Sequence, residues 1–205
     1  MRFKDEQGKA YAKWEEKGFG DVFEITSSKR VFQDEWTTFG VPFYRAREIV
    51  KLCNDGFIEN ELFISEEMFT SYQSKYGAPR ENDILVTGVG TLGKTYIVKA
   101  KDRFYFKDGN IIWFKSSRIV NSKYINQLFQ TKIIMEQISN NASITTVGTY
   151  TIDSAKKTKF PCPSIEEQNK IASFLSSLDA KIESVSAQIE RTQGFKKGLL
   201  QQMFV

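Results

Sequence analysis

Residues 161–190 of this chain, PCPSIEEQNKIASFLSSLDAKIESVSAQIE, determine its architecture. Two prolines end the preceding segment, and SIEE at 164–167 is typical of a capping box that opens a helix. Apolar residues then recur at spacings of 4, 3, 4, 3 and 4, which is a heptad seam and not the wider stripe of a globular helix. The seam residues are Ile171, Leu175, Leu178, Ile182, Val185 and Ile189. The pattern therefore predicts a helix that needs a partner helix.

The phase of this pattern changes after residue 189. The next apolar positions are Phe195, Leu199 and Met203, and Gly194 and Gly198 weaken the helix there. A continuous helix over residues 164–205 would be about 60 Å long, which exceeds the diameter of the domain before it. We therefore expect a projecting helix that associates with itself or with helices of another protein. A helix that folds back on its own domain is the alternative.

Residues 1–160 predict a mixed domain of short strands and helices, so the whole chain falls in the α+β class. A Ser-Glu-Glu start predicts a helix from residue 65 to about 75, and an apolar face predicts a second helix from 122 to 140. β-branched and aromatic runs predict strands at 83–87, 94–99, 103–106 and 111–115. The turn KDGN at 107–110 predicts a hairpin between the last two strands.

The composition of the 205 residues excludes several classes of protein. No histidine is present, which removes Ser-His-Asp and Cys-His nucleophile systems and most zinc or non-haem iron sites. Cys53 and Cys162 stand far apart, so we expect buried free thiols. No apolar run reaches the length of about 20 residues that a membrane helix needs, and the N-terminus lacks a secretory signal. We expect a cytoplasmic protein without a cofactor or metal.

The distribution of charge points to a polyanion as partner. The net charge is +4, but residues 85–160 carry 12 basic and only 4 acidic side chains. Neutralisation of phosphates by such a segment supplies affinity for nucleic acid that is independent of sequence. A solvated lysine face is the alternative.

Residues 88–95, GVGTLGKT, match both the dinucleotide-binding and the phosphate-loop patterns. Each of those sites needs a helix immediately after the loop, whereas residues 95–98 predict a strand. We therefore interpret the segment as a glycine-rich turn between two strands, in which glycine lets the backbone approach a DNA phosphate. The candidate contacts are Thr87, Gly88, Gly90, Thr91 and Lys94, with a plain tight hairpin as the alternative.

Several segments together resemble one half of a type I restriction-modification specificity subunit, the DNA-reading component of that complex. They are WEEKGFGD at 14–21, GVPFYRAREI at 40–49, DILVTGVGTLG at 83–93, Gly148-Thr149, FPCPSIEEQ at 160–168 with Ile171, and FKKGLLQQMF at 195–204. The chain departs from the family in length, because family members carry two recognition domains and two spacer helices. The resemblance implies a target recognition domain at 1–160 and a conserved spacer helix at 161–205.

The resemblance also implies that the chain has no catalysis of its own. Spacer helices of the family pair antiparallel, as a coiled coil that sets the distance between two recognition domains. A half-length chain would then dimerise through its seam, extended by Phe195 and Leu199, and would read a palindromic, bipartite target. Methyltransferase and restriction subunits are the implied partners. A truncated module that docks on those subunits without reading DNA, and an enzyme that uses a nucleotide at 88–95, are the competing hypotheses.

Arginine and lysine side chains are the candidates for contact with double-stranded DNA. For the reading of bases we favour Arg45 and Arg47, because arginine can bond guanine O6 and N7 bidentately, together with Lys29 and Arg30. For phosphate contacts, which position the protein without specifying sequence, we favour Lys94, Lys115 and Arg118. Surface salt bridges are the alternative role for each.

Overall fold

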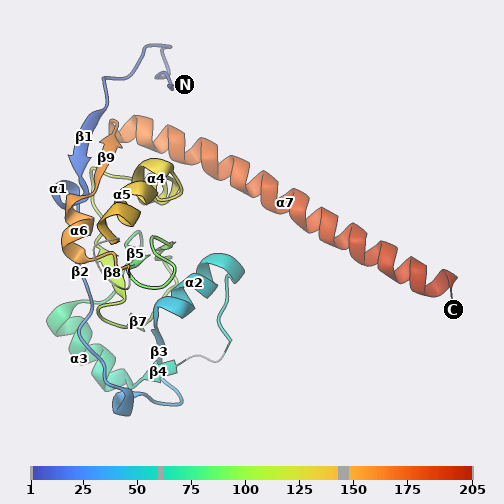
Figure 1. Cartoon of the computed structure of the whole chain (residues 1–205), viewed down its shortest axis with the longest axis horizontal. Coiled ribbons are helices and arrows are strands. Elements are labelled where there is room, and N and C mark those ends of the chain that lie inside the picture. The colour runs from blue at the N-terminus through green and yellow to red at the C-terminus, as the bar shows by residue number, and fades with distance from the viewer. Residues whose placement is uncertain (1, 60–61, 143–147, 205) are drawn as a thin grey trace.

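A long helix extends from a body of short strands and helices in the computed structural model, which describes residues 2–59, 62–142 and 148–204 (Figure 1). The elements in chain order are β1 (Glu15–Gly18), α1 (Phe19–Val22), β2 (Ile25–Thr26), the 3-10 helix η1 (Gln33–Glu35), β3 (Val41–Tyr44), α2 (Ala46–Asp55), β4 (Leu62–Ile64), α3 (Glu66–Tyr76), β5 (Ile84–Thr87), β6 (Thr95–Ile97), β7 (Tyr105–Phe106), β8 (Ile111–Phe114), α4 (Ser122–Leu128), α5 (Lys132–Ala142), α6 (Ile152–Lys157), β9 (Lys159–Cys162) and α7 (Ile165–Met203). Residues 2–162 are called the body below. Among the described residues no helix combines the length and apolar character needed to cross a bilayer.

Three small sheets organise the body. A four-stranded antiparallel sheet has the order β2-β8-β5-β6, and a three-stranded sheet has the order β4-β3-β7, in which β3 and β7 are parallel. The third sheet joins β1 to β9 and so brings residues 15–18 against the segment that leads into α7. The expected mixed fold with short strands and a long C-terminal helix is confirmed.

Helices cover both faces of the four-stranded sheet, which explains why its central strands β5 and β8 are apolar at nearly every position. Successive side chains of β5 and β8 point to opposite faces of the sheet and pack into different cores. Ile84, Val86, Ile112 and Phe114 point into the first core, where α1, α4, α5, α6 and β9 pack. Leu85, Ile111 and Trp113 point into the second core, which α2 closes through Ile49. A third core lies around β3 and β7.

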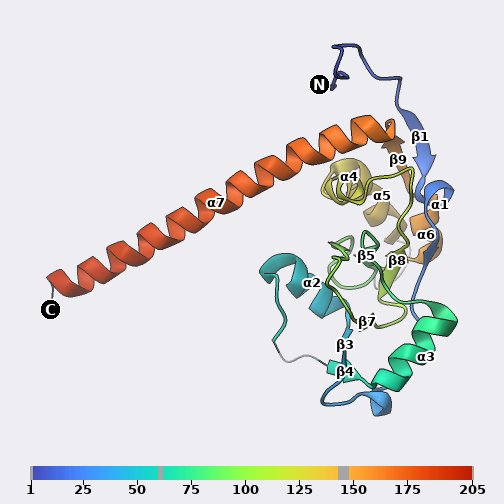
Figure 2. The ribbon, with the colours of Figure 1, turned by 180° about the vertical axis from the view of Figure 1, so that it is seen from behind.

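The N-terminal part of helix α7 contacts the body as far as Asp179, and the rest of the helix extends alone (Figures 1 and 2). Its N-cap Ser164 accepts a hydrogen bond from the Glu167 amide, as expected. Glu167 does not complete the expected capping box, because its buried carboxylate turns toward the body. The helix continues unbroken through Gly194 and Gly198. It does not fold back on the body.

The seam residues of α7 fall into two groups. Ile171 packs against the first core, which corrects the expectation that it faces a partner helix, and Leu175 is half-buried. From residue 178 onward the six predicted seam residues are exposed over 38–68% of their surface. These are Leu178, Ile182, Val185, Ile189, Phe195 and Leu199.

Two expectations about local structure were wrong. The helix expected over 122–140 is two helices, α4 and α5, because the Leu128 carbonyl accepts hydrogen bonds from the Thr131 amide and hydroxyl and ends the first. The strands β7 and β8 do not form a hairpin, since β7 pairs with β3 and β8 pairs with β2 and β5. Full burial of Tyr105 in the third core and of Phe106 in the second outweighs the local preference of the KDGN turn.

Candidate nucleic-acid interface

Loops from four parts of the sequence meet at one end of the four-stranded sheet. The strands β2 and β5 end there, and β6 and β8 begin there, as the pairings Thr26 with Trp113 and Thr87 with Ile111 require. The parallel strands β3 and β7 also end side by side, with Tyr44 opposite Phe106. We call the loops at residues 27–30, 88–94 and 107–110, together with residues 45–48 at the start of α2, the loop edge.

Hydrogen bonds tie the loops of the loop edge to one another and to the strand ends. They join Ser27 Oγ to the Ile111 carbonyl (3.0 Å), Ser28 Oγ to the Phe106 carbonyl (2.6 Å), the Lys107 amide to the Tyr44 carbonyl (2.8 Å) and the Gly88 amide to the Asn110 carbonyl (2.9 Å). Because each bond joins a loop to a strand end or to another loop far away in the sequence, the relative positions of the loops are set before any partner binds.

The loop edge is positively charged. Its residues carry six cationic side chains and two acidic ones. The cations are Lys29, Arg30, Arg45, Arg47, Lys94 and Lys107, and the anions are Glu48 and Asp108. A local excess of this kind attracts a polyanion by its field and releases counterions from nucleic acid on contact.

Arg45 and Arg47 both bind the buried carboxylate of Glu48, but they differ in exposure. Arg45 donates to Glu48 through Nε (3.0 Å), Nη2 (2.9 Å) and its amide (3.0 Å), and its guanidinium lies 5.6 Å from the centre of the Trp36 ring. Burial alone would raise the Glu48 pKa, yet hydrogen bonds from Arg45 and Arg47 hold that pKa below its usual value. The Arg45 side chain is only 23% exposed, whereas that of Arg47 is 69% exposed. Of the two guanidinium groups, that of Arg47 is therefore the more accessible from solvent.

Lys29 and Arg30 are exposed on the same edge. Arg30 Nε lies 2.9 Å from Asp108 Oδ2, and Lys29 Nζ lies 5.5 Å from the centre of the Tyr76 ring. The Lys29 amide donates to the Tyr105 hydroxyl, which anchors this loop on β7. Both cationic groups remain accessible from solvent.

Thr87 and Gly88 hold the glycine-rich turn together and do not present a surface. Thr87 is 0% exposed, and its hydroxyl donates to the Thr91 carbonyl and accepts from the Lys94 amide at 3.0 Å. A Cβ on Gly88 would lie 2.6 Å from the Tyr150 carbonyl oxygen. The glycine therefore lets the backbone at residue 88 approach another segment of the same chain, at Tyr150, and not a DNA phosphate. This corrects the expectation that Thr87 and Gly88 contact DNA.

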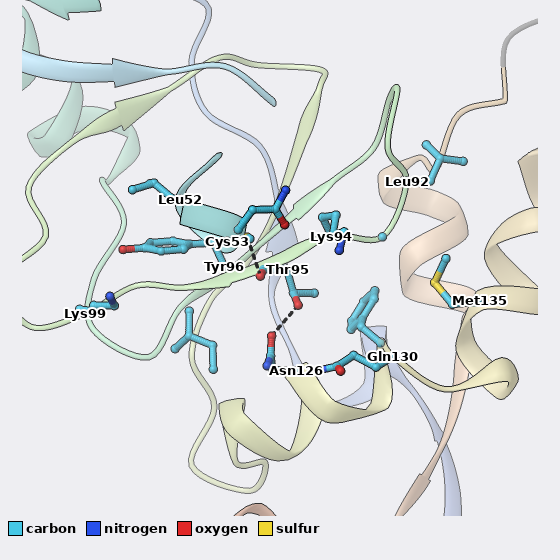
Figure 3. A pocket seen from close by; sticks show the side chains of 14 residues that line it. Leu52, Cys53, Leu92, Lys94, Thr95, Tyr96, Lys99, Asn126, Gln130 and Met135 are labelled. Carbon is cyan, nitrogen blue, oxygen red and sulfur yellow. Dashed lines mark hydrogen bonds between the residues drawn. The ribbon is translucent and has the colours of Figure 1, made fainter. Parts of the chain in front are cut away.

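Gly90, Thr91 and Lys94 are exposed on the turn, and Lys94 leads into a cavity of about 660 Å³ (Figure 3). The cavity lies along the edge strand β6, between α2 and α4, and Lys94, Lys99, Asn126 and Gln130 supply polar lining. Cys53 also lines it, with Sγ donating to the Thr95 carbonyl, and burial raises the pKa of this thiol. Among the residues described by the structure, those that line the cavity include two lysines and no carboxylate. This composition suits an anionic group such as a DNA phosphate.

Lys115 and Arg118 do not belong to the loop edge, because they follow β8 at the opposite end of the sheet. Lys115 is paired with Glu24 and lies 5.0 Å from the centre of the Trp113 ring, while Arg118 is exposed. The sequence reasoning missed Lys107 and Lys99. Only the strand pairing and the cavity bring these two lysines to the candidate interface, although both belong to the basic segment 85–160. Within the described ranges there is no group of three His, Cys, Asp or Glu side chains that could hold a metal ion.

A basic loop edge and a projecting helix with an exposed apolar seam characterise a protein that binds partners, and comparison with known proteins identifies the family. Residues 11–191 match the family model described as type I restriction modification DNA specificity domain. The chain therefore belongs to the family of type I restriction-modification specificity subunits.

Individual relatives agree with this assignment. The chain is 30% identical over 169 residues to a putative type I restriction enzyme specificity subunit of Haemophilus influenzae, covering 82% of this chain and 40% of that protein. It is 26% identical to the putative MjaX specificity subunit of Methanocaldococcus jannaschii, covering 98% of this chain and 48% of that protein. The chain thus spans less than half the length of these relatives.

Solved structures share the fold. The HsdS subunit from Thermoanaerobacter tengcongensis superimposes with a TM-score of 0.60 at 14% identity, over 90% of this chain and 42% of that one. The S subunit from M. genitalium gives a TM-score of 0.58 at 18% identity, over 93% and 44% of the two chains. At these identities the likeness concerns the arrangement of elements, including the long helix.

Proposed function

We propose that this chain is a DNA sequence-recognition module of a type I restriction-modification system and that it acts as a homodimer. The observation that carries the proposal is the unpaired apolar seam of α7, exposed from Leu178 to Leu199 on a helix that leaves the body. A seam of this kind is stable in water only when another helix covers it. The family assignment and the basic loop edge support DNA as the ligand.

A second copy of α7 is the partner that suits the seam best. Leu199 and Met203 lie 10 and 14 residues after Ile189, so they return to the same heptad register, with polar Thr192 and Lys196 between them. Antiparallel pairing of two such helices puts the two bodies at opposite ends. A two-fold axis then inverts the second body, so the target consists of two identical inverted half-sites across a fixed gap.

In this proposal residues 1–160 form the target recognition domain and residues 161–205 the spacer helix. The chain itself performs no catalysis, and it recruits a methyltransferase subunit and a restriction subunit that do. The competing hypothesis is a module that docks on those subunits without reading DNA. A nucleotide-dependent enzyme is disfavoured, because strand β6, and not a helix, follows the glycine-rich turn.

Selection of bound duplexes from random DNA, followed by sequencing, tests the proposal. The chain is used with and without a co-expressed cognate methyltransferase subunit. Two identical inverted half-sites at one spacing are the expected result. Enrichment of an asymmetric site would show that the chain works beside a different second half, and an absence of enrichment in both conditions would favour the interaction-only hypothesis.

Arg47→Ala should relax the preference at one base position of each half-site. It should also weaken the free energy of binding to the preferred duplex by about 1–3 kcal/mol. The exposed guanidinium of Arg47 has the donors for a bidentate bond to guanine. Binding of the selected duplex and of its single-base variants measures the change. Lys157→Ala, which removes an exposed cation of α6 outside the loop edge, serves as the matched comparison. If Arg47→Ala keeps the complete sequence preference, its assignment as a base reader is wrong.

Lys94→Gln should weaken binding to all duplexes alike, and it should reduce the magnitude of the negative slope of log K against log salt by about 1. The reason is that Lys94 sits at the mouth of a cavity whose described lining has no carboxylate to compete for it. Titrations at several salt concentrations give the slope. Lys157→Gln is the control, since Lys157 is an exposed lysine of α6 that belongs neither to the loop edge nor to the lining of the cavity. Equal slopes for the two variants would contradict a phosphate contact at Lys94.

A further inference from the structure

The N-terminal segment, residues 2–14, lies against the first turns of α7 (Figure 1). Glu167, in the first turn, is 0% exposed. Its Oε2 accepts from Arg2 Nη2 at 2.8 Å and from Trp14 Nε1 at 2.8 Å, and its Oε1 accepts from Arg2 Nε at 3.3 Å. The Arg2 guanidinium also donates to the Ala12 carbonyl and lies 5.4 Å from the centre of the Trp14 ring.

A buried carboxylate is stable only while its partners stay in place, because removal of one leaves a desolvated charge. The partners of Glu167 come from a segment more than 150 residues away in the sequence. These bonds therefore join the first turn of α7 to a distant part of the chain, which a local cap would not do. They determine where the helix lies on the body.

The other side of the same turns is bonded to the body as well. Gln168, also 0% exposed, accepts from the Asn121 amide at 2.9 Å and donates to the Pro163 carbonyl at 2.9 Å. Further along, Gln127 Nε2 of α4 donates to Asp179 Oδ2 at 2.8 Å. With contacts on both sides, α7 cannot swing in either direction without breaking buried hydrogen bonds.

The length of α7 amplifies any change at this attachment. From Glu167 to Met203 the helix extends about 54 Å at about 1.5 Å per residue. A tilt of about 10° at the base would therefore displace its end by about 9 Å, which is more than two base pairs at about 3.4 Å each.

We propose that Glu167, held by Arg2 and Trp14, is a positioning residue that fixes the direction of α7 and thereby sets the gap between the two half-sites. This inference rests on the proposed function, because a gap exists only if two bodies are joined through their helices. It assigns to the N-terminal segment a role in target specificity without any contact to DNA.

The first test measures the direction of α7 without DNA. Spin labels on Lys75→Cys in α3 and Gln201→Cys in α7, in a Cys53→Ala background, report the distance within one chain when labelled protein is diluted in unlabelled protein. Arg2→Gln and Glu167→Gln should broaden the distance distribution by several ångströms. Glu166→Gln, which removes the exposed neighbouring carboxylate, should leave the distribution narrow. Equally narrow distributions in all variants would overturn the positioning role.

The second test measures the gap. Duplexes with two half-sites at gaps differing by single base pairs are bound to each variant, beside a duplex with one half-site. Arg2→Gln and Glu167→Gln should accept at least one additional gap on either side, with unchanged affinity for the single half-site. A distance distribution that broadens without any change in gap preference would overturn the link to specificity. If the unmodified chain binds no bipartite duplex, the proposed function fails, while the distance measurement still decides the positioning role.

Discussion

Ile182→Glu should convert the dimer into monomers and weaken binding to a duplex with two half-sites by about 100-fold or more. Ile182 is 64% exposed and lies within the free part of the seam. In a paired helix each such side chain contributes about 1.5–3 kcal/mol through burial, and a glutamate at the position would be desolvated without a partner. The loss on DNA follows because two linked bodies bind two half-sites with an effective concentration that separate bodies lack.

Sedimentation velocity and duplex binding measure the two effects of Ile182→Glu. Affinity for a duplex with one half-site should not change, since the body that reads it is intact. Ala180→Glu introduces the same charge on the same helix but outside the seam, and it should leave both dimer and affinity unaltered. A dimer that survives Ile182→Glu would show that α7 is not the interface, and a monomeric unmodified chain would contradict homodimerisation.

The long helix could be predicted from the sequence because its signals are local. The Ser164 cap, the absence of proline and the heptad spacing each involve residues a few positions apart, and the structure has a helix from Ile165 to Met203. The strands β5 and β8 were found for the same reason, as short apolar runs. The role of Glu167 could not be found this way, because its spacing from Ser164 fits a capping box while its partners are Arg2 and Trp14.

The candidate interface was predictable in composition but not in arrangement. Cationic residues were recognised, yet their assembly into one edge depends on β7 pairing with β3, and a favourable turn at 107–110 indicated a hairpin instead. Lys107 was missed for that reason, and Lys115 was grouped with residues at the other end of the sheet. Burial also cannot be read from a glycine-rich motif, in which Gly88 and Gly90 look equivalent although only Gly90 is exposed.

Gly88→Ala should destabilise the fold by about 3 kcal/mol, the upper end of what overpacking of a well-packed site costs. The added Cβ would lie 2.6 Å from the Tyr150 carbonyl oxygen, a backbone atom that cannot rotate away. The backbones of Gly88 and Tyr150 are also bonded to each other, since the Gly88 carbonyl accepts from the Tyr150 amide, and the Gly88 amide donates to the Asn110 carbonyl. Relief of the contact therefore requires a shift of two backbone segments.

Thermal unfolding of Gly88→Ala and Gly90→Ala distinguishes a packing role from a DNA contact. Gly90 has a φ of +70° and open space around its Cβ position, so alanine there should cost only the left-handed strain of about 1–2 kcal/mol. A drop of about 6–12 °C in Tm is expected for Gly88→Ala, given about 2–4 °C per kcal/mol in a chain of this size. Its loss of DNA binding should follow the loss of folded protein. A Gly88→Ala variant with unchanged Tm and impaired DNA binding would show that Gly88 contacts DNA. It would contradict the packing role that we infer from the burial of Gly88.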